Sequence, residues 1–202
     1  MSRVFLSGSH SSGKTTLAKS LAEKLGWTYV GEAARSVIEK LGKPQGKSFS
    51  ELIDFQEAVF KAQKKAQKYE GVFLTDDREL SDNLVVDRSM VDVVAYLEWF
   101  YRQAKDVSAE DFKKYADLRL RILDAFYLSS EDQLIILPPP EKPEDDGVRF
   151  TDGAEEFHKL LMAEVWREFD RQSDFHKKVL RIEERGTPEE YLEKAVNFVL
   201  RK

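Results

Sequence analysis

Near the N-terminus the chain reads Gly8-Ser9-His10-Ser11-Ser12-Gly13-Lys14-Thr15, which matches the pattern G-x-x-x-x-G-K-[ST] at every fixed position. A short apolar run, residues 3–7, precedes this loop, and Leu17, Leu21 and Leu25 follow it at helical spacing. Strand, glycine-rich loop and helix therefore occur in the order that a phosphate-binding loop requires. The pattern predicts that a phosphorylated ligand binds at this loop.

The chemistry of such a loop follows from its backbone. Glycines let consecutive N–H groups turn toward a phosphate chain at the N-terminus of a helix. Lys14 then lies between the outer phosphates, and the Thr15 hydroxyl ligates Mg²⁺. His10 occupies a variable position, and we expect no catalytic role for it. The residues expected to bind the nucleotide are Gly8, Ser11, Ser12, Gly13, Lys14, Thr15 and Thr16.

Length and composition narrow the class of protein. A chain of 202 residues suits a single α/β domain spanning residues 1–202. The absence of cysteine excludes disulfides, thiolate zinc sites and cysteine nucleophiles. No apolar run is long enough to span a membrane, so we expect a cytoplasmic protein. The net charge of −5 argues against a nucleic-acid partner, because duplex binding needs a basic stripe.

A second candidate group follows the β-forming residues 27–31, which predict a short strand. This strand delivers Glu32 and Arg35 to its carboxyl end, the edge at which ligands bind in open α/β sheets. Both side chains are therefore candidates for contacts to the hydroxyl or phosphate of an acceptor. The alternative is a solvated ion pair between positions i and i+3 of the next helix.

A third group ends the buried-strand pattern of residues 83–87 with Asp87-Arg88-Ser89. Phosphate-loop enzymes keep a second acidic residue here, beside the phosphates and the metal. A water-activating ATPase often has glutamate after this aspartate, so Arg88 favours transfer to an organic hydroxyl. Asp87 would accept the hydroxyl proton or hold the metal's water shell, and Arg88 would bind the acceptor or the transferring phosphate. Alternatively, Asp87 only caps the next helix.

Two further helices carry candidate groups. Ser89 and Asp92 have the spacing of a helix cap, and we expect Asp92 to face the cleft and bind substrate. Gln56 and Gln63 share one side of a long helix that begins near Ser48. For these two amides, a position on the surface is favoured over one that faces the substrate.

A proline-rich segment at about residues 138–153 leaves the strand at residues 133–137. We interpret it as a lid that covers the substrate, with Arg149 supplying positive charge to the transition state. A plain linker is the alternative. Because strands alternate with helices along the chain, we expect a mostly parallel sheet with helices on both faces. The groups at Lys14, Glu32 and Asp87 should then meet at one edge.

The chain resembles the P-loop kinases grouped around the ribosylnicotinamide kinase domain of NadR-type proteins. The motifs that carry this resemblance are the loop Gly8–Thr15, Glu32-x-x-Arg35, Asp87-Arg88-Ser89 with Asp92, and Asp146-Gly147-x-Arg149. Asp87-Arg88-Ser89 is also similar to an element of deoxynucleoside kinases. The resemblance implies a P-loop NTPase three-layer sandwich, in which five strands are ordered 2-3-1-4-5.

The resemblance further implies that ATP and Mg²⁺ form the donor and that the acceptor is nucleoside-like: nicotinamide riboside, a deoxynucleoside or a nucleotide. Asp87 and Arg88 would then lie in the acceptor pocket. One alternative is a nucleotide-dependent switch or regulatory protein, although the Asn-Lys-x-Asp and Asp-x-x-Gly strings of GTPases do not occur in the chain. Another is a kinase that acts on a modified base within DNA, for which the negative net charge of the chain offers little support.

Overall fold

The computed structural model describes residues 2–67, 83–126, 128, 131–142, 153–171 and 174–201. Most of the expected lid, with Asp146, Gly147 and Arg149, lies outside the described residues. The expectations for these residues therefore stay predictions.

The sheet has five strands: β1 (Arg3–Ser7), β2 (Thr28–Val30), β3 (Leu84–Asp87), β4 (Gln133–Ile136) and β5 (Val179–Arg181). Their order is β2-β3-β1-β4-β5, and every neighbouring pair is parallel. This confirms the predicted strand order. In the register of β1 and β3, Leu6 lies opposite Asp87, so these central strands end side by side. The loop after β1 and the residues after β3 therefore start from the same edge.

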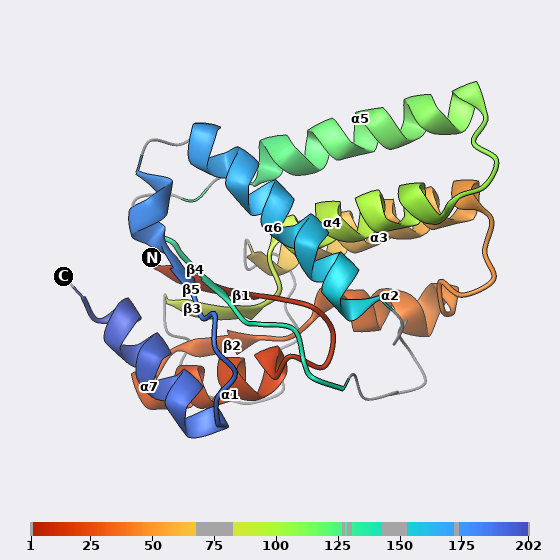
Figure 1. Cartoon of the computed structure of the whole chain (residues 1–202). Coiled ribbons are helices and arrows are strands. Elements are labelled where there is room, and N and C mark those ends of the chain that lie inside the picture. Colours follow the sequence, from red (N-terminus) through yellow and green to blue (C-terminus); the bar gives the residue numbers. More distant parts are fainter. Residues whose placement is uncertain are drawn as a thin grey trace.

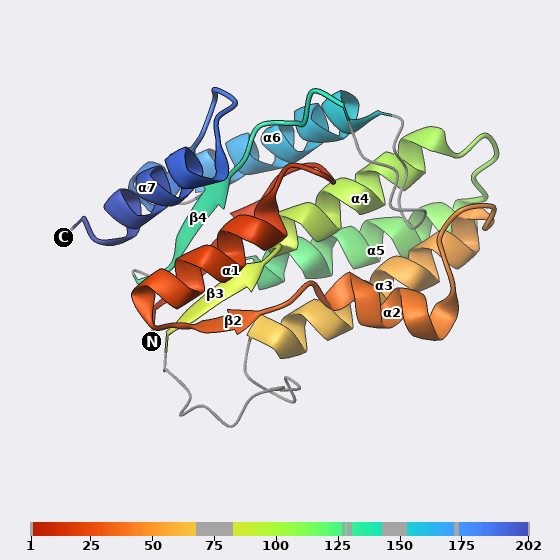
Figure 2. The ribbon, with the colours of Figure 1, turned by 90° about the horizontal axis from the view of Figure 1, so that it is seen from below.

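The helices are α1 (Lys14–Leu25), α2 (Ala33–Leu41), α3 (Phe49–Gln67), α4 (Met90–Gln103), α5 (Ala109–Ala125), α6 (Ala154–Arg171) and α7 (Pro188–Val199), with a short 3₁₀ turn, η1 (Phe175–Lys178). Figure 1 shows α1 and α7 below the sheet and α3 to α6 above it. In the view from below, α1 and α7 lie in front of the strands (Figure 2). The result is the expected three-layer sandwich.

Alternating side chains of the strands supply both cores. In β1, Phe5 belongs to the core between the sheet and helices α3 to α6, whereas Val4 and Leu6 belong to the core between the sheet and helices α1 and α7. All three side chains are buried, as the two-residue period of a strand covered on both faces requires. Burial of each side chain of this size stabilises the folded state by about 1.5–3 kcal/mol. The central strands are thus anchored on both faces, which fixes the position of the loops that follow them.

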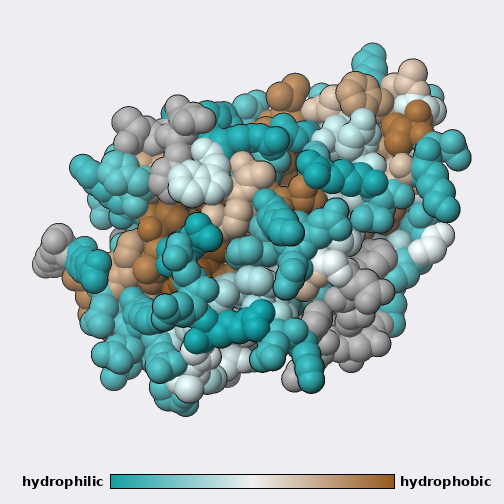
Figure 3. Space-filling view, viewed as in Figure 1, coloured by the Kyte–Doolittle hydropathy of each residue, from teal (hydrophilic) through white to brown (hydrophobic). Residues whose placement is uncertain are grey.

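Sequence signals at the helix starts also agree with the structure. Ser89 and Asp92 form a capping box at α4, and Thr187 and Glu190 form one at α7, where Pro188 is the first helical residue. Within the described ranges, we find no helix with both the length and the apolar character needed to cross a membrane. The face shown in Figure 3 is mostly hydrophilic, with apolar residues in small groups.

Candidate active site

The glycine loop joins β1 to α1 and forms a tight turn around the N-terminus of the helix. Gly8 has φ 148° and Gly13 has φ 86°, both in a region that L side chains rarely adopt. A Cβ atom at Gly8 would lie 3.0 Å from the carbonyl oxygen of Leu137, on the neighbouring strand end. These two glycines are therefore required by the geometry of the loop, which agrees with their fixed places in the motif.

Lys14 folds back over this loop and is buried. Its Nζ donates to the Ser9 carbonyl oxygen at 2.5 Å and to Ser12 Oγ at 3.2 Å. Burial, and then the positive charge of Arg88, lowers the pKa of Lys14 from 10.5 to about 7. The buried Ser9 hydroxyl makes no hydrogen bond within the described part of the chain. A buried cation that donates hydrogen bonds only to neutral oxygens of the described residues, and an unpaired hydroxyl, fit the phosphate groups of a nucleotide.

Asp87 ends β3 beside the start of α1. The Thr15 hydroxyl donates to Asp87 Oδ2 at 2.6 Å, and the Tyr29 hydroxyl lies 3.5 Å from the same oxygen. Burial, followed by the charge of Asp87, raises the pKa of Tyr29. A hydroxyl and a carboxylate are hard oxygen ligands of the kind that Mg²⁺ prefers. Among the described residues there is no cluster of three or more His, Asp or Glu side chains suited to a metal.

Arg88 and Glu32 form a buried ion pair next to this group. Arg88 Nε donates to Glu32 Oε1 at 2.6 Å, and each side chain is only 5% exposed. The guanidinium also lies 5.2 Å from the centre of the Tyr96 ring. Burial opposes the charge of Arg88, but Glu32, Tyr96 and Asp92 outweigh it and raise its pKa. Arg88 is therefore a fixed cation that Glu32 largely neutralises.

Arg35 and Asp92 occupy different surroundings from this pair. Arg35 Nε lies 3.4 Å from Glu32 Oε2, but its side chain is 60% exposed, so it stands at the outer rim. Asp92 is fully buried, and its carboxylate accepts hydrogen bonds from the Ser7 hydroxyl at 2.6 Å and the Ser89 N–H at 2.9 Å. Asp92 also accepts from Arg88 at 3.3 Å. It thereby ties the end of β1 to the cap of α4.

A pocket that Arg88 lines opens between α2, α3 and α4. Its polar groups are Glu32, Gln56, Gln63, Arg88 and Asp92. Its walls are apolar or aromatic and come from Ala34, Ile38, Pro44, Phe55, Val59, Val93, Tyr96 and Phe100. Neither Asp87 nor Thr15 lines it. The site thus divides into a phosphate side around α1 and an adjoining pocket that Arg88 and Glu32 enter.

The prediction that Gln56 and Gln63 lie on the surface is wrong, since they are 3% and 1% exposed. Gln63 Nε2 donates to the carbonyl oxygen of Arg88 at 2.9 Å, whereas Gln56 Oε1 is buried without a hydrogen bond to the described residues. Their spacing of seven residues places both on the side of α3 that also carries Val59, which is buried. In the sequence, the shared side of the helix was the signal that both amides are buried. The prediction instead followed their polarity, which favours exposure to solvent. Tyr29 was not predicted as part of the site.

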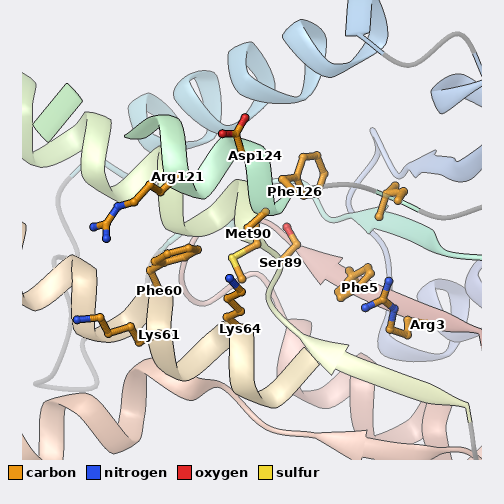
Figure 4. A pocket seen from close by; sticks show the side chains of 12 residues that line it. Arg3, Phe5, Phe60, Lys61, Lys64, Ser89, Met90, Arg121, Asp124 and Phe126 are labelled. Atoms are coloured by element: carbon orange, nitrogen blue, oxygen red, sulfur yellow. The ribbon is translucent and has the colours of Figure 1, made fainter. Parts of the chain in front are cut away.

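A larger cavity, of about 650 Å³, lies apart from the glycine loop, between the ends of α3 and α5 and the start of β1. Phe60, Met90 and Phe126 are among the side chains around it (Figure 4). Two basic side chains at its rim, Lys61 and Arg121, pair with Glu57. It includes no residue of the glycine loop.

A parallel sheet ordered 2-3-1-4-5, with a glycine loop leading from its central strand into a helix, defines the P-loop NTPase fold. A protein-family model described as AAA domain matches residues 3–185, and the chain belongs to this family. A comparison with curated proteins finds no match.

Solved structures share the fold. NadR protein in complex with NAD and AMP-PNP matches with a TM-score of 0.70 and 19% identity over 100% of this chain and 50% of that chain. NadR in complex with NR gives a TM-score of 0.69 and 18% identity with the same coverage. The chain thus spans about half the length of the NadR chains. Deoxyadenosine kinase from M. mycoides with bound dATP gives 0.63 and 17%, covering 98% of both chains. The expected likeness to these kinases is confirmed as a likeness in fold.

Proposed function

We propose that the protein is a kinase that transfers the γ-phosphate of ATP, with Mg²⁺, to a hydroxyl or phosphate of a nucleoside-like small molecule. The observation that carries this proposal is the buried Arg88–Glu32 pair in a pocket directly beside the glycine loop. A protein that only binds or hydrolyses a nucleotide has no need of a second pocket with a buried cation and carboxylate at this edge. The nucleoside and nucleotide ligands named for the similar structures support the same class.

On the donor side, the nucleotide phosphates would lie in the loop, near the Ser9 hydroxyl and the ammonium of Lys14. Bound Mg²⁺ neutralises charge on the phosphates during transfer. Thr15 and Asp87 are the residues that would hold it. Asp87 was assigned either the hydroxyl proton or the water shell of the metal; its contact with Thr15 and its absence from the pocket lining favour the second role.

On the acceptor side, Glu32 would accept the proton of the attacking hydroxyl, a role that its position in the pocket lining supports. Arg88, whose Nε donates to that carboxylate at 2.6 Å, would contribute positive charge where the phosphate is transferred. Arg35 at the rim would contact an acceptor phosphate, and Arg149 would add charge at the transition state. Asp92 would hold Arg88 rather than bind substrate directly.

The remaining lining suits a planar ring. Phe55, Tyr96 and Phe100 provide aromatic surface, and the unpaired Gln56 oxygen can accept a hydrogen bond from the edge of a heterocycle. The pocket measures about 50 Å³ in this structure, so an acceptor of nucleoside size requires the helices around it to move apart. Opening to admit an acceptor, followed by closure around it, is common in enzymes that must exclude water.

The test is ATP consumption with Mg²⁺ against nucleosides, nicotinamide riboside, nucleoside monophosphates and oligonucleotides, with products identified by mass. We expect one class of small molecule to gain one phosphate as one ADP forms. Phosphate on an oligonucleotide alone would support the kinase acting on a base in DNA. Slow hydrolysis that no acceptor accelerates would contradict the kinase and favour a nucleotide-dependent switch.

A further inference from the structure

Arg88 adopts a backbone conformation that is unusual for its residue type. Its φ is 88°, in the left-handed region, and among the described non-glycine residues only Ser11 shares a positive φ. Residues with a Cβ atom occupy this region at a cost in free energy, so surrounding contacts must maintain it. Residues held in such a conformation cluster at functional sites.

The turn at Arg88 determines where its side chain goes. The Arg88 N–H still donates to the Leu6 carbonyl at 2.9 Å, as the last bond beside the β1–β3 ladder. One residue later, the Ser89 hydroxyl accepts from the Val91 N–H and caps α4. Between these two anchors the chain turns, and the guanidinium reaches Glu32. The orientation of the peptide group between Arg88 and Ser89 therefore helps to determine whether Arg88 reaches Glu32 in the pocket.

Gln63 binds that peptide group from a different part of the chain. Its side-chain amide donates to the Arg88 carbonyl at 2.9 Å, across 25 residues of sequence and at a buried position. Without this donor, the Arg88 carbonyl would lose a buried partner, which is costly, and its peptide group would be freer to rotate. A water molecule has little access, since Gln63 and Arg88 are 1% and 4% exposed.

We propose that Gln63 is a positioning residue that holds Arg88 in the left-handed turn and so keeps its guanidinium on Glu32. The effect on turnover rests on the proposed kinase function, whereas the effect on the backbone does not. A glutamine that only fills space would affect stability and leave both the turn and the chemistry unchanged. The amide acts through Arg88 and does not touch the reacting groups.

The test is Gln63→Met, which keeps the length of the side chain and removes the donor. In its crystal structure we expect Arg88 to leave the positive φ region and Arg88 Nε to separate from Glu32. We expect kcat to fall about 10- to 100-fold, the loss that misplaced catalytic groups cause, with KM for ATP within about twofold of wild type. Circular dichroism verifies the fold, and Gln63→Leu replaces the variant if it fails to fold.

The matched control is Gln56→Met, two turns earlier on α3, whose amide makes no contact with the Arg88 backbone. It should raise KM for the acceptor and leave the turn at Arg88 intact. In an Arg88→Ala background, adding Gln63→Met should cause no further loss, because the two residues act as one unit.

Retention of the positive φ and of the Glu32 contact in Gln63→Met would overturn the proposal, and so would unchanged kcat. A further fall in kcat when Gln63→Met is added to Arg88→Ala would also overturn it. If the wild-type protein phosphorylates no acceptor, the kinase proposal fails, but the crystal structure still decides whether Gln63 holds the turn.

Discussion

The phosphate loop and the pocket beside it meet at one edge of the sheet, but they are assembled in opposite ways. The loop motif is eight consecutive residues, six between β1 and α1 and two at the start of α1, and its shape comes from the backbone at Gly8 and Gly13. The pocket takes Glu32, Gln56 and Arg88 from separate places in the chain, and its shape comes from packed side chains. A local, backbone-built site can serve any nucleotide, whereas a pocket of dispersed side chains can be adapted to one acceptor.

The two regions also treat positive charge differently. Lys14 is buried without a carboxylate hydrogen-bond partner among the described residues, and its pKa falls to about 7. Arg88 is buried against Glu32 and Asp92, and its pKa rises. The loop therefore holds a cation without a carboxylate hydrogen-bond partner in the described ranges, whereas the cation of the pocket is paired with two carboxylates.

Removing the cation of the loop should have the largest effect. We expect Lys14→Ala to lower kcat/KM for ATP by about 1,000-fold, because the variant lacks the buried ammonium group that would stabilise negative charge on the transferring phosphate. Thermal unfolding followed by circular dichroism should show an intact fold. Lys24→Ala, at an exposed position of the same helix, is the control and should behave like wild type. Wild-type turnover in Lys14→Ala would disprove the role of the loop.

The next largest effects come from two carboxylate variants, one in the pocket and one beside the phosphate loop. We expect Glu32→Gln to lower kcat about 100-fold with KM for ATP unchanged, as for a lost proton acceptor. Asp87→Asn should instead raise the Mg²⁺ concentration required for half-maximal activity about tenfold, with part of kcat recovered at high Mg²⁺. Magnesium titrations of both variants test this. If Asp87→Asn loses kcat at saturating Mg²⁺ and Glu32→Gln does not, the two assignments are exchanged.

The pH dependence of nucleotide binding sharpens the contrast in charge. Free Lys14 loses its proton above a pKa of about 7, and phosphate binding favours the charged ammonium, so binding takes up a proton at higher pH. Affinity for a non-hydrolysable ATP analogue should then fall by up to about tenfold per pH unit above pH 7. Calorimetry in buffers of different ionisation enthalpy measures the uptake. Lys14→Arg stays charged and should abolish it; a flat wild-type profile would contradict the account.

The smallest effects concern the amide of the pocket. Gln56 Oε1 is buried without a partner, so Gln56→Met should stabilise the fold by about 1 kcal/mol, a rise of about 2–4 °C in Tm. The same change should raise KM for the acceptor about fivefold and leave ATP affinity unchanged. Scanning calorimetry and steady-state kinetics provide both values. A lower Tm with unchanged KM would show that the amide is structural.

The sequence predicts the loop and the helix caps well, because each depends on nearby residues, whereas the strand order was predicted from the resemblance to P-loop kinases. Ser89 with Asp92 is one example: a spacing of three residues is enough to define the cap. Gln63 and the backbone of Arg88 could not be predicted, since their contact joins positions 25 residues apart and depends on a left-handed φ at a non-glycine residue. The burial of Gln56 was missed for a related reason, because only the packed helices show that its polar group faces a pocket.

The central claim is that the phosphoryl acceptor occupies the pocket between α2, α3 and α4. The most direct measurement uses Ala34→Phe, which fills this pocket from the first turn of α2 and leaves the residues of the glycine loop unchanged. Binding of a non-hydrolysable ATP analogue and phosphoryl transfer are measured on the same preparation. We predict an unchanged Kd for the analogue and a loss of transfer of about 100-fold or more. Transfer at the wild-type rate would show that the acceptor binds elsewhere and would contradict the account.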